Sequence, residues 1–112
     1  YYSYMTRPSK KRLFPEPIEF DWDEGNADKN WIRHHVSQSE TEFVFFNEPK
    51  FVFNDAAHSK VEKRFICLGK TKQGRHLFVS FIIRDQKIRV ISARDMTSRE
   101  HQEFDKYEKE NS

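Results

Sequence analysis

The stretch EKRFICLGKTKQGRHLFVSFIIRDQKIRVISA, residues 62–93, decides the fold. β-Branched and aromatic residues dominate it, and two polar segments, one around Gly74 and one at Asp85-Gln86, interrupt it. Apolar runs bounded by turn residues predict antiparallel strands joined by tight turns. We place strands at Glu62–Lys70, His76–Arg84 and Lys87–Ala93, and one more short strand in FVFND, residues 51–55.

Three helix-start signals flank the strands, at Asp23, at Ser37 with Glu40, and at Thr97 with Glu100. They predict a helix over residues 24–34, a second helix that Asn47 and Pro49 end, and a C-terminal helix. Spacings of three and four residues assign these inward faces: Ala27, Trp31 and His34; Phe43, Val44 and Phe46; and His101, Phe104 and Tyr107. Two helices, about four antiparallel strands and a terminal helix make an α+β architecture.

A chain of 112 residues fits one domain, and eleven phenylalanines predict an aromatic core. Residues 1–17 hold three prolines, a Lys10-Lys11-Arg12 run and no sustained period. We therefore expect a basic, flexible arm over residues 1–17 and a single domain over residues 18–112.

The net charge of +2 hides a strong segregation along the chain. Residues 50–94 carry eleven cations and three anions, or +8, whereas residues 18–49 carry two cations and eight anions, or −6. A polyanion responds to such local potential more than to the net charge, so the basic half of the chain indicates an acidic partner.

Several classes of protein and site are excluded or disfavoured. The one cysteine, Cys67, rules out an internal disulfide and suggests a reducing compartment. No run approaches the ~20 apolar residues of a membrane span, so we expect a cytoplasmic protein. The adjacent His34 and His35 diverge on a helix, and no H-E-x-x-H or C-x-x-C pattern occurs, so we expect neither a metal site nor a cofactor.

Arginines on the predicted strands are the best candidates for binding phosphate, because a guanidinium group donates two parallel hydrogen bonds to phosphate oxygens. Alternation places Glu62 and Arg64 on one face of their strand. In the last strand it puts Arg89, Ile91 and Ala93 on one face and Ile88, Val90, Ser92 and Arg94 on the other.

These residue types suffice for cleaving RNA without a metal. Attack of a ribose 2′-hydroxyl on its phosphate needs a base, an acid and cations for the developing charge. The candidates are Glu62, His34 or His58, Arg64 and Arg94, and the identity of the base stays open.

Four segments, in order and spacing, resemble the BrnT toxins of bacterial type II toxin–antitoxin modules: IEFDWDEGNADKNWIRHHVS, SETEFVFFNEP, FNDAAHSKVEKRFICLG and KIRVISARDMTSREHQEFDKY. The resemblance implies a RelE-like fold, a sheet flanked by helices, and a ribonuclease that arrests growth. It also implies a cognate BrnA-like antitoxin with a ribbon-helix-helix DNA-binding module, which could form a heterotetramer with the toxin.

The resemblance points to these residues: Arg33, His34, His58, Glu62, Arg64, Ser92, Arg94 and Tyr107. We expect a catalytic set of Arg64, Arg94, Glu62, His58 and His34. We expect contacts to the RNA substrate from Arg33, Ser92 and Tyr107 and from the strand cations Lys63 and Arg89.

Two positions depart from the family pattern. His35 stands where a glycine usually ends the helix, so it must adopt a left-handed conformation or the turn must differ. Asp95 stands where a second basic residue usually follows Arg94, and it either pairs with Arg94 or begins the cap of the last helix. The alternatives to a ribonuclease are a non-catalytic nucleic-acid-binding or repressor-complex subunit and an unrelated interaction domain.

Overall fold

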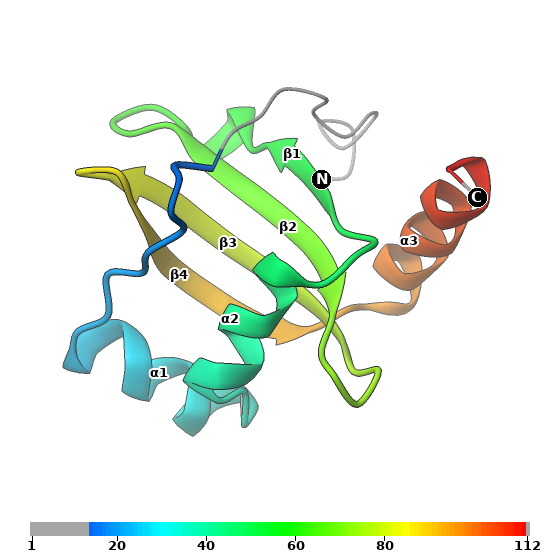
Figure 1. The fold of residues 1–112 in the computed structure, drawn as a ribbon, viewed down its shortest axis with the longest axis horizontal. Coiled ribbons are helices and arrows are strands. Elements are labelled where there is room, and N and C mark those ends of the chain that lie inside the picture. The colour runs from blue at the N-terminus through cyan, green and yellow to red at the C-terminus, as the bar shows by residue number, and fades with distance from the viewer. Residues whose placement is uncertain (1–13, 112) are drawn as a thin grey trace.

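Two helices, four strands and a third helix follow one another along the chain, which confirms the predicted α+β architecture (Figure 1). The computed structural model describes residues 14–111. Its elements are α1 (Glu24–His34), α2 (Gln38–Phe46), β1 (Phe51–Asn54), a 3₁₀ turn (Ala56–His58), β2 (Arg64–Lys70), β3 (His76–Arg84), β4 (Lys87–Asp95) and α3 (Ser98–Glu110). None of the helices in this part of the chain is long and apolar enough to cross a membrane.

The strands form one antiparallel meander in the order β1-β2-β3-β4. Both hairpin turns have the backbone that the sequence predicts. Asp85 and Gln86 have φ of 52° and 62°, as the two central residues of a type I′ turn require, and Gly74 has φ of 87°. The three capping boxes also form, at Asp23, Ser37 and Thr97.

Alternation along β2 and β3 divides the buried side chains between two cores on opposite faces of the sheet. The first, the α1–α2 core, includes Val44 and Phe45 of α2 together with Phe65, Cys67, Leu77, Val79, Phe81, Ile88, Val90 and Ala93. The second, the α3 core, consists of Phe51, Phe53, Ile66, Leu68, Phe78, Phe104 and Tyr107. Burial raises the pKa of the Cys67 thiol to about 12, in keeping with a core residue.

Aromatic rings hold the α1–α2 core together. Phe45 packs edge-on against Phe81 at 5.1 Å between ring centroids, and Phe65 stacks on the same ring at 5.5 Å. Phe14 lies 5.5 Å from Phe45, although residue 14 falls within the predicted flexible arm. The described end of that arm therefore packs on the domain, and residues 1–13 lie outside the described residues.

The inward face of α1 is made by asparagines, and the predicted Trp31 stripe is wrong. Asn26 and Asn30 are buried, whereas Trp31 is 53% exposed. The Asn26 amide donates to the Val90 carbonyl at 3.1 Å, and the Asn30 side-chain oxygen accepts from the Ala93 N–H at 2.9 Å. Amide groups suit this place because β4 is an edge strand, whose backbone groups would otherwise lack partners.

The buried face of α2 also differs from the prediction, because only Val44 of the predicted Phe43, Val44 and Phe46 is buried. Thr41, Val44 and Phe45 are buried, while Phe46 is 60% exposed. Positions 41, 44 and 45 share one helix face at spacings of three and four, and Phe46 lies about 100° away from Phe45.

A β-bulge in β4 overturns the predicted alternation of that strand. Ser80 pairs with Ser92 but Phe81 pairs with Val90, so Ile91 is an extra residue. Val90 and Ala93 consequently lie in the same core. The strand also runs on to Asp95, and β2 begins at Arg64, which leaves Glu62 in the preceding loop.

Gly69 is required where α2 crosses β2. A Cβ atom at this position would lie 2.7 Å from Cγ1 of Val44, whose side chain is buried and, being β-branched, has little rotamer freedom in a helix.

We predict that Gly69→Ala lowers the free energy of unfolding by about 1–3 kcal/mol in urea titrations, as overpacking of cores does. Gly25→Ala in α1 is the matched control, because its Cβ meets only Asp23 Oδ1 at 3.3 Å. An unchanged stability of Gly69→Ala would contradict the packing.

Candidate functional site

Three of the candidate residues lie on the α3 side of the sheet. Strand register pairs Arg64 with Ile82, Ser92 with Ser80 and Arg94 with Phe78, and all three β3 partners share the face of Phe78 in the α3 core. Ile82 and Phe78 are four residues apart, about 13 Å along the strand. Arg64 and Arg94 therefore share a face but occupy different ends of it.

Arg64 has the most unusual environment of the candidate residues. Its Nε atom is buried and has no hydrogen-bond partner within the described chain, and no ion pair involves its side chain there. A buried donor without a partner costs about 1–3 kcal/mol relative to a bonded one. Its backbone is well held, because its N–H donates to Ser59 Oγ at 2.9 Å and its carbonyl accepts from the Asp55 N–H at 2.8 Å.

His58 lies in the 3₁₀ turn, close to the backbone hydrogen bonds of Arg64, and a carboxylate orients its ring. Its Nδ1 is 2.9 Å and 3.0 Å from the two carboxylate oxygens of Asp55, which is buried, whereas His58 is 53% exposed. Nε2 has no partner among residues 14–111 and is left for proton exchange. An imidazole held by a carboxylate at one nitrogen is the arrangement that fixes a catalytic tautomer.

Ser59 joins the His58 turn to the start of β2. Its hydroxyl donates to the Asp55 carbonyl at 2.6 Å while accepting from the Arg64 N–H. The residues Asp55, His58, Ser59 and Arg64 thus form one hydrogen-bonded unit. Sequence reasoning missed Asp55, although its spacing of three from His58 was a usable signal.

Glu62 and Lys63 are near this unit in the chain but have other partners. Glu62 forms an exposed ion pair with Arg84 at 2.8 Å. The hydrogen bond from Arg84 lowers the pKa of Glu62, so this carboxylate is a weaker base than an unpaired one. Lys63 is exposed, and its Nζ lies 5.8 Å from the ring centroid of Phe65, a residue of the α1–α2 core.

Arg94 is bound in a different way from Arg64. Its guanidinium donates two hydrogen bonds, of 2.8 Å and 2.9 Å, to Glu100, a carboxylate with 0% exposure, and it stacks on the Phe78 ring at 4.0 Å. The same pair links the end of β4 to the first turn of α3. Arg94 therefore has a structural role, whatever it does for a substrate.

Asp95 adopts neither of the two predicted roles. Its carboxylate accepts two hydrogen bonds from Arg75, at 2.6 Å and 3.1 Å, and Thr97 caps α3 instead. This bond, the largest cause, lowers the pKa of Asp95. The side-chain pairing expected with Arg94 is replaced by a hydrogen bond from Arg94 to the Asp95 carbonyl.

Arg75, which the sequence did not single out, ties α1, α2 and β4 together. Besides Asp95, its guanidinium donates to the carbonyls of His34 and His35 and to Glu40 Oε2. His35 has φ of 52° and ψ of 39°, which confirms that it takes the left-handed conformation. Arg33 and His34 end α1, and the His34 carbonyl accepts from Arg75 in the turn between β2 and β3, at the other end of β2 from Arg64. The structure therefore does not bring them to Arg64.

Two of the expected substrate contacts are engaged elsewhere. Arg89 pairs with Asp23 at 2.7 Å and with Asp21 at 3.5 Å, which fastens β4 to the segment before α1. Tyr107 is buried between Phe51 and Phe53 in the α3 core, and burial is the main reason that its pKa rises to about 12.

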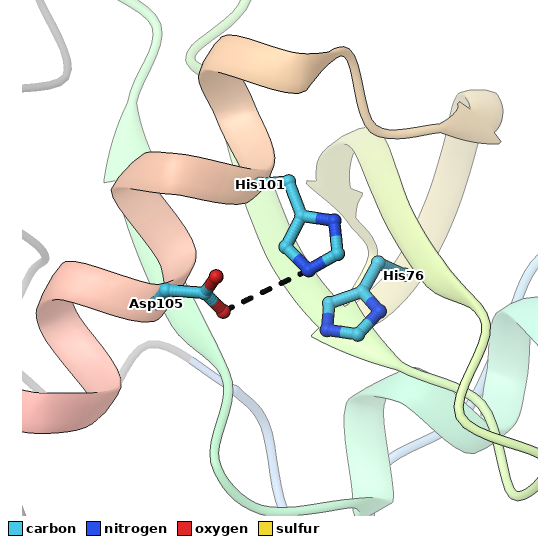
Figure 2. A group of neighbouring side chains, drawn as sticks. All are labelled: His76, His101 and Asp105. Atoms are coloured by element: carbon cyan, nitrogen blue, oxygen red, sulfur yellow. Dashed lines mark ion pairs between the residues drawn. The ribbon is translucent and has the colours of Figure 1, made fainter.

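A second polar cluster lies at the far end of β3. His76 stacks on His101 of α3 with 3.9 Å between ring centroids, and His101 Nε2 lies 3.7 Å from Asp105 Oδ1 (Figure 2). Burial, followed by the charges of His101 and Lys70, lowers the pKa of His76. One ligand atom from each of His76, His101 and Asp105 lies within 4.8 Å of the other two, a grouping that sequence spacing did not reveal.

The Arg94–Glu100 pair gives a stability prediction. Arg94→Met removes two charged hydrogen bonds from the fully buried Glu100 carboxylate and should lower the free energy of unfolding by on the order of 3 kcal/mol. Adding Glu100→Gln should restore at least half of the loss, because glutamine keeps the capping box but carries no charge. Chemical denaturation measures both. Equal stabilities of the single and double variants would show that the pair does not hold α3.

Comparison with known proteins places the chain in a family. The family model described as "Ribonuclease toxin, BrnT, of type II toxin-antitoxin system" matches residues 22–100, well over half of the chain and all of the elements from α1 to the start of α3. Among curated proteins, no match is found. The matched region contains the Asp55–His58–Ser59–Arg64 unit and the Arg94–Glu100 pair, and the chain belongs to the BrnT family of ribonuclease toxins of type II toxin–antitoxin systems.

Proposed function

We propose that this chain is a metal-independent endoribonuclease in which Arg64 binds the reacting phosphate and His58 transfers a proton. The family supplies the reaction class. The observation that carries the assignment of residues is the buried Nε of Arg64, which has no partner among residues 14–111. The main chain of Arg64 is hydrogen-bonded to Ser59 and Asp55, beside the Asp55–His58 pair.

The proposed reaction is an internal phosphoryl transfer. The ribose 2′-oxygen attacks the adjacent phosphorus and the bond from phosphorus to the 5′-oxygen breaks, which yields a 2′,3′-cyclic phosphate and a 5′-hydroxyl. A base accepts the 2′-hydroxyl proton, and an acid gives a proton to the departing 5′-oxygen. Arg64 neutralises charge on the phosphoryl oxygens, and a donor fixed in place before the reaction does so without reorganisation.

His58 is a better proton carrier here than Glu62. Asp55 holds its Nδ1, so Nε2 is left to exchange protons with substrate. Glu62 is engaged by Arg84, which favours its ionised form and weakens it as a base. We propose Glu62, Lys63, Ser92 and Arg94 as positioning or RNA-contacting residues around this pair, and we assign no chemical step to Arg33, His34, Arg89 or Tyr107.

A type II family implies a protein antitoxin as partner. We propose that the antitoxin is BrnA-like, with a ribbon-helix-helix DNA-binding module, that it neutralises the toxin in the cytoplasm, and that two copies of each chain assemble. Co-expression tests the neutralisation: growth arrest by the chain alone and growth with the neighbouring gene support it. Arrest that persists with that gene would contradict it.

Arg64→Ala should abolish most RNA cleavage without unfolding the protein. Loss of one donor to the developing charge costs about 10²–10³ in rate in other enzymes, and Arg64 has no ion-pair partner in residues 14–111 whose burial would penalise the change. The matched control is Lys72→Ala, which removes one exposed cation from the turn between β2 and β3. Cleavage of a labelled RNA in EDTA, with circular dichroism for folding, measures both variants.

The outcomes separate the two classes of function. Cleavage by the unaltered chain in EDTA, lost in Arg64→Ala and kept in Lys72→Ala, supports the proposal. Salt-sensitive RNA binding without cleavage in any form would favour the non-catalytic alternative. Equal cleavage by Arg64→Ala and the unaltered chain would remove Arg64 from the mechanism.

The Asp55–His58 pair should act through the imidazole. His58→Gln should slow cleavage by about 10²–10⁴, the usual contribution of a general acid or base, while RNA affinity stays within a few fold. Asp55→Asn should reduce the rate less, because it changes the tautomer and orientation of the ring rather than removing it. Single-turnover cleavage rates and a binding titration with uncleavable RNA check this. A loss of affinity without a loss of rate would make His58 a binding residue.

A further inference from the structure

The cluster of His76, His101 and Asp105 is separate from the proposed cleavage residues. His76 begins β3 and pairs with Lys70, the last residue of β2, whereas Arg64 is the first residue of that strand. Six residues of strand separate the two ends by about 20 Å. The three residues therefore lie at the opposite end of β2 from Arg64, and the proposed reaction assigns no step to them.

We propose that His76, His101 and Asp105 form a binding site for a divalent transition-metal ion of the Zn²⁺ type, which joins α3 to the sheet. His101 and Asp105 are four residues apart and so lie on one face of α3, and His76 meets them from β3. In Figure 2 the two rings and the carboxylate gather on one side of the helix.

The spacing of the ligand atoms is close to that of a bound site, and the stacked rings of His76 and His101 must turn so that their nitrogens converge on one ion. Zinc bound by histidine nitrogens and carboxylate oxygens at about 2.0–2.2 Å in a tetrahedron places neighbouring ligand atoms about 3.3 Å apart. The three candidate ligand atoms already lie within 4.8 Å of one another. Both α3 residues are exposed, with side-chain exposures of 47% and 60%, so small side-chain rotations can draw them together. Solvent can then supply the fourth ligand.

The ligand set also selects the kind of ion. Imidazole nitrogens favour zinc, nickel and copper, whereas magnesium and calcium favour sites made of oxygen ligands. Two imidazoles and one carboxylate therefore predict binding of Zn²⁺ or Ni²⁺ and weak or no binding of Mg²⁺.

The surroundings support the ring of His76 and restrain the nearest cation. The ring of His76 packs perpendicular to the ring of Phe104, with 5.2 Å between the ring centroids. Lys70, on the neighbouring strand, is held by Glu108 at 3.3 Å and by the face of Phe104 at 5.7 Å. Glu108, one turn beyond Asp105, thus turns the Lys70 ammonium toward α3. Because this positive charge repels a metal cation, replacing Lys70 with a neutral residue should strengthen metal binding.

Bound metal would add a cross-link between elements that otherwise meet through the α3 core. His76 comes from β3, and the two other ligands come from the half of α3 that follows Glu100, the partner of Arg94. A ligand that binds only the folded chain stabilises it by mass action. The metal would therefore hold α3 against the sheet at the end opposite Arg64.

Thermal unfolding of the full chain, purified without a histidine tag, tests the proposal. At a Zn²⁺ concentration 100-fold above the dissociation constant, the melting temperature should rise by roughly 10 °C. EDTA should reverse the rise, and Mg²⁺ at the same concentration should have no effect. Titration against a coloured zinc chelator gives the stoichiometry, expected to be one ion per chain.

Variants assign the ligands. His76→Gln, His101→Gln and the surface change Asp105→Asn should each weaken Zn²⁺ binding by at least about tenfold, and Lys70→Met should tighten it. His34→Gln, which removes a histidine from α1, is the matched control and should keep the full response. An unaltered chain that does not respond to Zn²⁺, or a response that survives both Asp105→Asn and His101→Gln, would overturn the proposal. These results do not depend on whether the chain cleaves RNA.

Discussion

The constraint on which the structure depends is that β2 and β3 are buried on both faces. Five consecutive residues of β2, Phe65–Gly69, are buried, and so are six of β3, Leu77–Ile82. Their side chains alternate between the α1–α2 core and the α3 core, so neither strand has room for a charge in its middle. Polar chemistry is confined to the strand ends. The proposed phosphate site lies at one end, with Arg64. The proposed metal site lies at the other end, with His76 next to Lys70.

Several cations of the basic segment, residues 50–94, form ion pairs within the chain that connect one element to another. Arg75 bonds to α1, α2 and the end of β4, Arg89 fastens β4 to the segment before α1, and Arg94 holds α3 through Glu100. The net charge of residues 50–94 therefore overstates the field available to a polyanion. Arg64 differs because its buried Nε has no partner in the described chain, and this difference favours it over the other arginines as the phosphate ligand.

The sequence predicted what local rules control. Capping boxes, hairpin turns, the left-handed His35 and the alternation of β2 all follow from residues close together in the chain. The sequence-based prediction failed where the surroundings of a helix or strand decide which of its side chains are buried. Trp31 is exposed because the edge of β4 offers backbone groups that asparagines satisfy. The bulge at Ile91 puts Ala93 in the same core as Val90, although simple alternation predicted opposite faces for these two residues.

The candidate site was predictable only in part for the same reason. His58 and Arg64 belong to a local unit, so residue types and spacing pointed to them, although Asp55 of the same unit was missed. The partners of Asp95 and Arg94, and the meeting of His76 with His101, depend on where α3 and the β2–β3 hairpin lie in space. No spacing rule in a single sequence contains that information.

The central claim is that the Arg64 guanidinium, whose buried Nε has no partner among residues 14–111, binds RNA phosphate. The most direct measurement is the ¹H–¹⁵N resonance of this group during titration with an RNA that is blocked at its 2′-oxygens, with Arg64→Lys used for assignment. We predict that this resonance shifts on binding by more than the resonance of Arg75, whose guanidinium is held by Asp95 and Glu40. An Arg64 resonance that is unchanged at saturating RNA would contradict it.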